Sequence, residues 1–263
     1  MSETLLSSRN LAFELYEVLD AEGLTQRERF AEHNRETFDA ALGTARSIAE
    51  KFFAPHNRKG DEHEPRYEDG QAVLIPEVKP AVDAFLEAGF LNAVRSFEAG
   101  GMQLPTLLSQ ACFAHFQAAN AASTSYPFLT MGAANLIESF GTEEQKQRFL
   151  QPMIDGRFFG TMALTEPHAG SSLSDIRTRA EPAADGSYRL KGNKIFISGG
   201  DHRDLHRVDR RQRQMCIRDS YCCVVGAWGA EKWLFDIIAL SVAQDWRQFI
   251  DAVQFCAGGD GRL

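Results

Sequence analysis

Cysteine and tryptophan are nearly absent from the first 200 residues of this 263-residue sequence, which contain one cysteine, Cys112, and no tryptophan. A single cysteine excludes a disulfide framework there and favours a reducing, cytoplasmic compartment. The sequence has no apolar run of about 18 residues, so we expect no membrane-spanning helix and no membrane partner. The segment from Met1 to Asn10 lacks the basic stretch and apolar core of a secretory signal.

Basic residues are outnumbered as well. The chain has 28 Lys and Arg against 36 Asp and Glu, which gives a net charge of −8 at pH 7. Because the nucleic-acid backbone is also negative, we expect no general affinity for nucleic acid. Hydrophobic residues make up 44% of the chain and charged residues 24%, as in ordinary globular domains. The length predicts about two domains.

The composition changes sharply after residue 200. The first 200 residues contain 19 Lys and Arg against 27 Asp and Glu, whereas the last 63 residues contain 9 of each. All three tryptophans and four of the five cysteines lie in that last segment. We therefore interpret residues 203–263 as an atypical tail, consisting of foreign or frame-shifted sequence, and expect it to make few contacts with the helices and strands that precede it.

A nucleic-acid patch and a metal site are two alternative interpretations of this tail, and the sequence favours neither. Six arginines within residues 203–220 could form a nucleic-acid patch, but aspartates are interleaved with them. His202 and His206 have the i, i+4 spacing of metal ligands on a helix. The adjacent pair Cys222-Cys223, however, does not supply the spaced cysteines of a four-ligand zinc site. No metal site is predicted.

Apolar residues recur at helical spacing through residues 1–157, which predicts an all-helical N-terminal domain. A first helix is expected to open near Thr25, to bury an apolar stripe that ends at Phe52, and to close at Pro55. A polar loop is expected to follow over residues 56–70. Two capping boxes mark helix starts, Thr25 with Glu28 and Thr142 with Gln145.

From Phe158 the pattern changes to the alternation that is typical of strands. Strands are predicted at 158–165, 175–182, 187–191 and 193–198, with Asp185-Gly186 as a hairpin turn. A helical half followed by strands predicts an α+β protein with separate domains. The expected boundaries are 1–157 for the helical domain, 158–202 for the start of an antiparallel β-domain, and 203–263 for the tail.

Two segments are the most informative part of the sequence. Residues 159–172 read Phe-Gly-Thr-Met-Ala-Leu-Thr-Glu-Pro-His-Ala-Gly-Ser-Ser, a strand that runs into a turn. Residues 192–200 read Gly-Asn-Lys-Ile-Phe-Ile-Ser-Gly-Gly, a short strand that places Phe196 and Ser198 on one face. In this order, behind a helical half, they closely resemble the flavin-contacting strands of the acyl-CoA dehydrogenase family, in the branch that includes 3-methylmercaptopropionyl-CoA dehydrogenases. The resemblance covers residues 1–202.

The resemblance implies FAD as the cofactor and assigns roles to particular residues. Thr165 would hydrogen-bond the pyrimidine end of the flavin, Gly170 would allow close approach of the backbone, and Ser171 would contact the CoA part of the substrate. Phe196 takes the place of a tryptophan that packs on the flavin, and Ser198 replaces a threonine whose hydroxyl reaches flavin N5. Ser172 departs from the usual aspartate. The full set of implied flavin-contacting residues is Met162, Leu164, Thr165, Gly170, Ser171, Phe196, Ile197 and Ser198. His168 lies in the variable position of the motif and is read as a loop histidine.

The activity implied by the resemblance is α,β-dehydrogenation of an acyl-CoA thioester, as in fatty acid metabolism. The family uses a glutamate base from a C-terminal helical domain or a helix near it, and nothing in residues 203–263 resembles that domain. We therefore expect that the base and the C-terminal helical domain are missing, and that this chain is an inactive fragment. An electron-transfer flavoprotein-like acceptor is the implied partner, and family members are usually homo-oligomers. The alternatives are a non-catalytic flavin- or acyl-CoA-binding protein of the same fold, and a related flavin oxidase or monooxygenase.

Overall fold

The computed structural model describes residues 5–68, 71–182, 188–199 and 238–241. The chain divides into two compact units, one formed by Met1–Glu64 with Ile75–Ser125, the other by Pro65–Leu74 with Tyr126–Leu263. The described residues are mostly helical, with short antiparallel strand pairs, so the prediction of an α+β fold is confirmed. The domain boundaries at 157 and 202 stay predictions.

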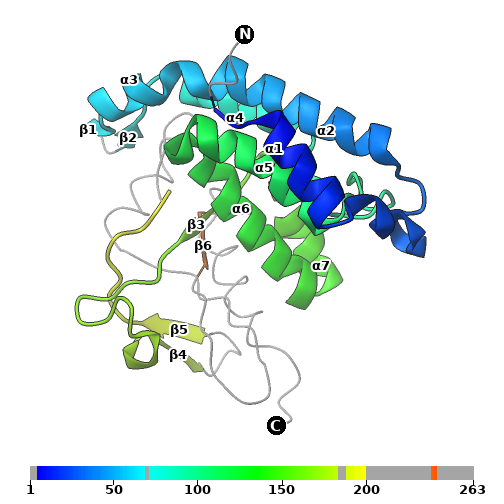
Figure 1. Ribbon diagram of the computed structural model, residues 1–263. Helices are drawn as coiled ribbons and strands as arrows, with labels where there is room; N and C mark the ends of the chain where they lie inside the picture. Colours follow the sequence, from blue (N-terminus) through cyan, green and yellow to red (C-terminus); the bar gives the residue numbers. More distant parts are fainter. Residues whose placement is uncertain (1–4, 69–70, 183–187, 200–237, 242–263) are drawn as a thin grey trace. The chain divides into compact units, whose positions relative to one another are not determined.

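The first unit is built from helices, and α2 packs against α5 and α4 in it (Figure 1). Its α-helices are α1 (Ser8–Ala12), α2 (Arg35–Ile48), α3 (Asn57–Glu62), α4 (Val78–Glu87) and α5 (Thr106–Ala119). Shorter turns join them: π-helical η1 (Phe13–Val18) and η4 (Ala49–Phe53), and 3₁₀-helical η2 (Ala21–Gln26), η3 (Glu28–Phe30), η5 (Ala54–His56) and η6 (Phe90–Asn92).

Helix α2 is capped by Asn34 and does not extend back to Thr25 as predicted. The Asn34 side chain accepts a hydrogen bond from the Thr37 amide at 2.9 Å, and the Thr37 hydroxyl accepts one from the Asn34 amide at 3.0 Å. The predicted capping box at Thr25 is wrong, because the Thr25 hydroxyl donates to the Glu22 carbonyl at 2.7 Å inside a 3₁₀ turn. Arg27, which is extended, separates this turn from the next one. The second predicted box is confirmed by a 2.8 Å bond from the Thr142 amide to the Gln145 side chain.

The segment around Pro55 is also more ordered than predicted. Pro55 does not end the helical path, because it lies in the first turn of η5, where its missing N–H breaks no hydrogen bond. Helix α3 then follows, and β1 (Arg66–Glu68) pairs antiparallel with β2 (Gln71–Val73). The polar loop predicted over residues 56–70 is therefore wrong.

The core of the first unit is aromatic. The rings of Phe85 and Phe116 meet edge to face with centroids 4.9 Å apart, and Phe53 and Phe116 with centroids 5.2 Å apart. The apolar stripe of α2 was predicted to end at Phe52, but Phe53 is the fully buried residue. The π-helical turn Ala49–Phe53 explains this shift, since each wider turn rotates the buried stripe by about one residue.

His56 is buried as well, although the predicted loop would have left it solvated. Its Nδ1 is 2.8 Å from the Phe52 carbonyl and its Nε2 is 2.8 Å from the Ser123 hydroxyl. A carbonyl can only accept, so Nδ1 carries the proton and Nε2 accepts from Ser123. Burial lowers the pKa of His56, which keeps the ring neutral in this polar contact of the core.

The second unit combines the end of α6 (Ala121–Phe140) with short helices and strand pairs. The helical elements are α7 (Glu143–Gln145), η7 (Lys146–Leu150), α8 (Gln151–Ile154) and η8 (Leu173–Asp175). Besides β1 and β2, its described strands are β3 (Phe159–Met162), β4 (Arg179–Pro182), β5 (Tyr188–Lys191) and β6 (Ile238–Ser241). Helix α6 packs its buried face on Phe149, Leu150 and Met153. Strands β4 and β5 pair antiparallel, as expected, although the predicted Asp185-Gly186 turn lies outside the described residues.

Strand β6 belongs to the tail, which was predicted to make few contacts with the preceding residues. It pairs antiparallel with β3, in the register that places Phe159 opposite Ser241 and Met162 opposite Ile238. For these four residues the prediction is wrong. The other interpretations of residues 203–263, including the histidine and cysteine pairs, lie outside the described residues.

Strand β3 lies close against α6 because Gly160 has no side chain. The Gly160 amide donates to the Thr130 hydroxyl at 3.1 Å. A Cβ placed on Gly160 would lie 2.6 Å from the Ala133 Cβ and 2.9 Å from the Leu129 carbonyl oxygen. Such distances are far inside van der Waals contact, so the strand could reach this position only as glycine.

We predict that Gly160→Ala destabilises the protein by about 1–3 kcal/mol, as overpacking usually does. Gly43→Ala is the matched control, because a Cβ on Gly43 meets nothing within 4 Å in the middle of α2. This control should stabilise the protein by roughly 0.5–1 kcal/mol, since alanine is the better helix former. Urea unfolding followed by circular dichroism measures both. Equal effects of the two substitutions would show that β3 does not pack on α6 as described.

Candidate functional site

The two segments that the sequence singled out lie side by side. Met162 and Ser198 exchange two backbone hydrogen bonds of 3.3 and 3.1 Å, and the Ile195 amide donates to the Thr165 carbonyl at 2.9 Å. The structure thereby brings together six of the eight predicted site residues from two stretches more than 30 positions apart in the sequence. Those six are Met162, Leu164, Thr165, Phe196, Ile197 and Ser198. We call residues 162–165 and 195–198 the strand crossing.

A tight turn follows the first segment of the strand crossing and leads to the remaining two residues, Gly170 and Ser171. Glu166 and Ala169 exchange backbone hydrogen bonds of 2.8 and 3.1 Å, which closes the turn. A Cβ on Gly170 would have the Thr165 methyl group as its near neighbour, at 3.9 Å, so Gly170 stands beside Thr165 with open space around it. Gly170 and Ser171 are both exposed.

Phe196 is the most unusual residue of the strand crossing. Its side chain is 81% exposed, and its backbone has a φ of +57°, in the left-handed region. For a residue other than glycine this conformation is unfavourable by roughly 1–2 kcal/mol. Backbone strain of this kind is concentrated at functional sites, where the surrounding structure maintains it. An exposed aromatic ring on a strained backbone is suited to stacking on a flat ligand.

The hydroxyls of the strand crossing complement that ring. Among the residues that the structure describes, the side-chain hydroxyls of Thr165 and Ser198 have no hydrogen-bond partner. Thr161 differs, because its hydroxyl is bonded to the Ser198 carbonyl. Thr165 and Ser198 can therefore donate to, or accept from, a bound molecule.

The sequence did not predict the buried ion pair beneath this surface. The Lys194 ammonium donates to the Glu166 carboxylate at 2.8 Å and to the Leu164 carbonyl at 2.9 Å. The same carboxylate accepts from the amides of Arg177 and Thr178, both at 2.9 Å. The side chains of Glu166 and Lys194 are 2% and 3% exposed. The antiparallel register could have revealed the pair, since Met162 opposite Ser198 also places Glu166 opposite Lys194.

These contacts set the charge of Glu166. Burial raises the pKa of a carboxyl group, but the hydrogen bonds from Lys194 and from the amides of Arg177 and Thr178 outweigh burial and lower the pKa to about 2. Glu166 is thus a fixed anion with most of its acceptor capacity in use. It is not free to remove a proton from a ligand.

His168 lies at the edge of the same cluster. Its Nε2 is 3.2 Å from the Asp175 carbonyl and 3.5 Å from the second oxygen of the Glu166 carboxylate. These contacts hold the histidine against its own loop, in agreement with its interpretation as a loop residue.

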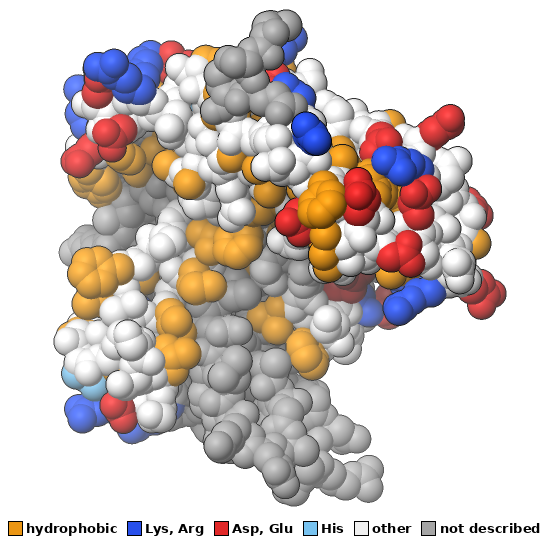
Figure 2. Space-filling view, in the orientation of Figure 1, with side chains coloured by type: hydrophobic (Ala, Val, Ile, Leu, Met, Phe, Trp, Pro, Cys, Tyr) orange, Lys and Arg blue, Asp and Glu red, His pale blue; other side chains and the backbone are white. Residues whose placement is uncertain are grey.

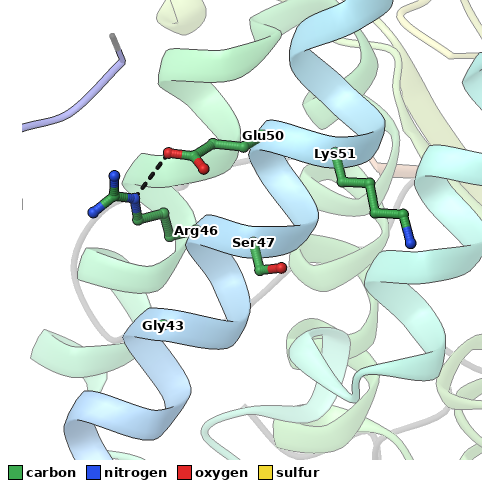
Figure 3. Close-up of a pocket in the computed structure, with 5 residues that line it drawn as sticks. All are labelled: Gly43, Arg46, Ser47, Glu50 and Lys51. Carbon is green, nitrogen blue, oxygen red and sulfur yellow. Dashed lines mark hydrogen bonds and ion pairs between the residues drawn. The ribbon is translucent and has the colours of Figure 1, made fainter. Parts of the chain in front are cut away.

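A separate surface hollow lies in the first unit, along α2 and η4 (Figure 3). It is lined by Gly43, Arg46, Ser47, Glu50 and Lys51, and Arg46 and Glu50 form an ion pair of 2.8 Å there. All five residues come from one helical stretch. The hollow therefore lacks the converging groups from different elements that define a binding site.

Several further features of the described residues bear on binding and reactivity. On the face shown in Figure 2, acidic and basic side chains of the described residues are interspersed. The described residues contain no cluster of three metal-ligating side chains. None of their helices combines the length and apolarity needed to cross a membrane. Burial raises the pKa of Cys112 to about 12, so its thiol is not reactive.

Comparisons with known proteins agree with the resemblance. Residues 35–157 match the family model described as acyl-CoA dehydrogenase, N-terminal domain. The chain is 38% identical to 3-methylmercaptopropionyl-CoA dehydrogenase of Ruegeria pomeroyi over 168 residues, which are 61% of this chain and 29% of the relative. The chain spans about a third of the length of the first curated relatives it matches.

Solved structures that are similar to this chain also include acyl-CoA dehydrogenases. Butyryl-CoA dehydrogenase from Megasphaera elsdenii is 29% identical with a TM-score of 0.50, over 63% of this chain and 41% of that one. An acyl-CoA dehydrogenase from Bacillus anthracis in complex with FAD is 20% identical with a TM-score of 0.54, over 80% of this chain and 37% of that one, and shows the fold alone. The resemblance predicted from the sequence is confirmed, while the roles of the individual site residues stay predictions.

The strain at Phe196 generates a prediction for two substitutions. Phe196→Gly should leave stability unchanged or raise it by up to about 1 kcal/mol, because glycine adopts positive φ freely and the lost ring buries little surface. Phe196→Val should lower stability by more than about 1 kcal/mol, since a β-branched residue tolerates this conformation poorly. Urea unfolding of both variants is the measurement. If glycine proved more damaging than valine, the left-handed conformation would be refuted.

The lowered pKa of Glu166 predicts an acid-dependent loss of stability. A carboxyl whose pKa falls on folding from 4.5 to about 2 stabilises the folded state by roughly 3 kcal/mol above pH 5, and this is lost as the pH falls from about 4.5 to 2. The free-energy difference between wild type and Glu166→Gln should therefore shrink over that interval. Glu98→Gln, at an exposed position, is the control for the loss of one carboxylate. A difference for Glu166→Gln that stays constant from pH 6 to pH 2.5 would contradict the assignment.

Proposed function

We propose that the chain supplies the helical and flavin-binding parts of an enzyme that dehydrogenates acyl-CoA thioesters at their α,β-bond, because residues 35–157 match the family model of the acyl-CoA dehydrogenase N-terminal domain. The observation that carries the proposal is the strand crossing. It presents an exposed aromatic ring at Phe196 beside the open backbone of Gly170, and hydroxyls at Thr165 and Ser198 that have no hydrogen-bond partner in the described part of the chain.

This set of groups fits FAD. A flavin is flat and apolar on its faces and carries hydrogen-bonding atoms along its edge, so it needs an aromatic neighbour and a few fixed donors. Phe196 and Ile197 provide exposed apolar surface, while Thr165 and Ser198 provide the hydroxyls. When bound, FAD supplies the acceptor for the hydride that leaves the β-carbon of the substrate.

The residues of this chain hold the ligands and leave proton removal to another group. Thr165 and Ser198 orient the flavin edge, and Ser171 contacts the CoA part of the thioester. Glu166 is excluded as the base, because its carboxylate is 2% exposed and bonded to Lys194 and two amides. We propose that the base is a carboxylate outside residues 1–202.

The partners follow from the same proposal. The reduced flavin passes its electrons to an electron-transfer flavoprotein-like acceptor, and the enzyme works as a homo-oligomer in fatty acid metabolism. The compartment is the cytoplasm, in keeping with a single buried thiol, Cys112, among the first 200 residues.

The test is a titration of the chain with FAD, followed by quenching of flavin fluorescence. We expect weak binding that is lost on desalting, because only part of the flavin surface is contacted by residues 162–198. Thr165→Val should weaken it about tenfold or more, since a hydrogen bond to a group that develops charge contributes roughly 1.5–3 kcal/mol. Thr44→Val, at an exposed position on α2, is the matched control. Equal titrations of the two variants would refute the role of Thr165, and no binding by the wild type would refute the flavin site in this chain.

Anaerobic mixing of the FAD-loaded chain with butyryl-CoA tests the location of the base. No bleaching of the flavin absorbance is expected, because Glu166 cannot take up the α-proton. Substrate-dependent bleaching would show that a base lies within these 263 residues.

A further inference from the structure

We propose that Glu166 and Lys194 are positioning residues that hold the two segments of the strand crossing in register. The Lys194 ammonium takes the place of a backbone N–H that the left-handed conformation of Phe196 turns away from the neighbouring segment. The link to FAD rests on the function proposed above. The structural part of the proposal stands on the contacts of the two side chains alone.

The register of the strand crossing shows what Lys194 replaces. In an antiparallel ladder, pairs that exchange two hydrogen bonds alternate with pairs that exchange none. Met162 and Ser198 are such a bonded pair, so the next bonded pair would be Leu164 with Phe196. The Leu164 carbonyl instead accepts from the Lys194 ammonium at 2.9 Å.

The backbone conformation of Phe196 explains why the Lys194 ammonium, and not a backbone amide, bonds the Leu164 carbonyl. A φ of +57° turns the peptide groups on both sides of the residue away from the direction of an extended strand. The next backbone bond along the ladder joins the Ile195 amide to the Thr165 carbonyl at 2.9 Å, one position out of the regular alternation. Phe196 therefore interrupts the ladder, and a side chain completes it.

Glu166 makes the buried ammonium possible. A lone buried cation is strongly unfavourable, and one carbonyl does not compensate for the lost water. The Glu166 carboxylate accepts from Lys194 at 2.8 Å and carries the connection onward to the amides of Arg177 and Thr178. Three stretches of chain, at residues 164–166, 177–178 and 194, are thus joined at one ion pair.

The pair lies where it determines the position of the ligand-facing groups. Lys194 is two residues before Phe196, and its contact at the Leu164 carbonyl is one residue before Thr165. Strain at Phe196 persists only if the surrounding bonds hold it. Without the ammonium, the Thr165 hydroxyl and the Phe196 ring lose their fixed relation, so Glu166 and Lys194 act on the ligand through these neighbours.

The test combines amide hydrogen exchange with FAD titration. Lys194→Met keeps the aliphatic stem and removes the ammonium, and Lys51→Met, at an exposed lysine of η4, is the matched control. We expect Lys194→Met to accelerate exchange at least tenfold at the amides of Met162, Ile195 and Ser198, with the amides of α2 and α5 unchanged. We also expect FAD affinity to fall at least tenfold, and Lys51→Met to change neither quantity.

Two further variants keep the proposal testable if Lys194→Met unfolds the chain. Glu166→Gln keeps an acceptor for one amide but leaves the Lys194 ammonium without its carboxylate, so it should accelerate exchange at Arg177 and Thr178 and also at the strand crossing. In the Phe196→Gly background the strand can become regular, so Lys194→Met should lower the urea midpoint less than it does in the wild type. Uniform acceleration across both units, or equal midpoint shifts in the two backgrounds, would overturn the proposal.

The two proposals fail in different ways. If the wild type binds FAD and Lys194→Met binds it equally well, the positioning role is wrong while the flavin site stands. If the wild type does not bind FAD, the flavin site is wrong, and the exchange rates together with the midpoint shifts still decide whether the pair holds the strands.

Discussion

A buried carboxylate must have its hydrogen bonds satisfied, and in the second unit the chain is arranged around this requirement at Glu166. Its side chain is 2% exposed and accepts hydrogen bonds from the Lys194 ammonium and from the amides of Arg177 and Thr178. These bonds set the path of residues 164–169 and of residues 194–198. The surface that we assign to the flavin consists of residues next to these bonds in the sequence, among them Thr165 and the exposed Phe196.

The helical unit depends on a different constraint, the packing of large aromatic rings. Phe53, Phe85 and Phe116 are fully buried and meet edge to face. The neutral His56 closes the same core with bonds to Phe52 and Ser123. Apolar packing provides the rigid scaffold, whereas the ion pair of the second unit provides precise geometry. The matching family model covers residues 35–157, and the strand crossing lies beyond it in the sequence.

Much of this architecture could be predicted from residue patterns. Period-two alternation predicted strands at 158–165 and 193–198, whereas the structure forms a strand only over Phe159–Met162 and pairs the second segment with it through the isolated Met162–Ser198 bridge. The two segments are nevertheless adjacent, in agreement with the resemblance. The left-handed backbone at Phe196 could not be predicted, because a strand pattern implies extended geometry at every position. Thr25 was read as a helix cap from spacing alone, while the extended Arg27 and the cap at Asn34 depend on tertiary packing. The π-helical turn at 49–53 shifted burial from Phe52 to Phe53 for the same reason.

A footprint of FAD on the protein by amide hydrogen exchange would locate the flavin site directly. We expect slower exchange on addition of FAD at residues 162–171 and 195–198, with no change along the surface hollow between Gly43 and Lys51. Protection at the hollow, or FAD binding without protection at the strand crossing, would contradict this location of the site.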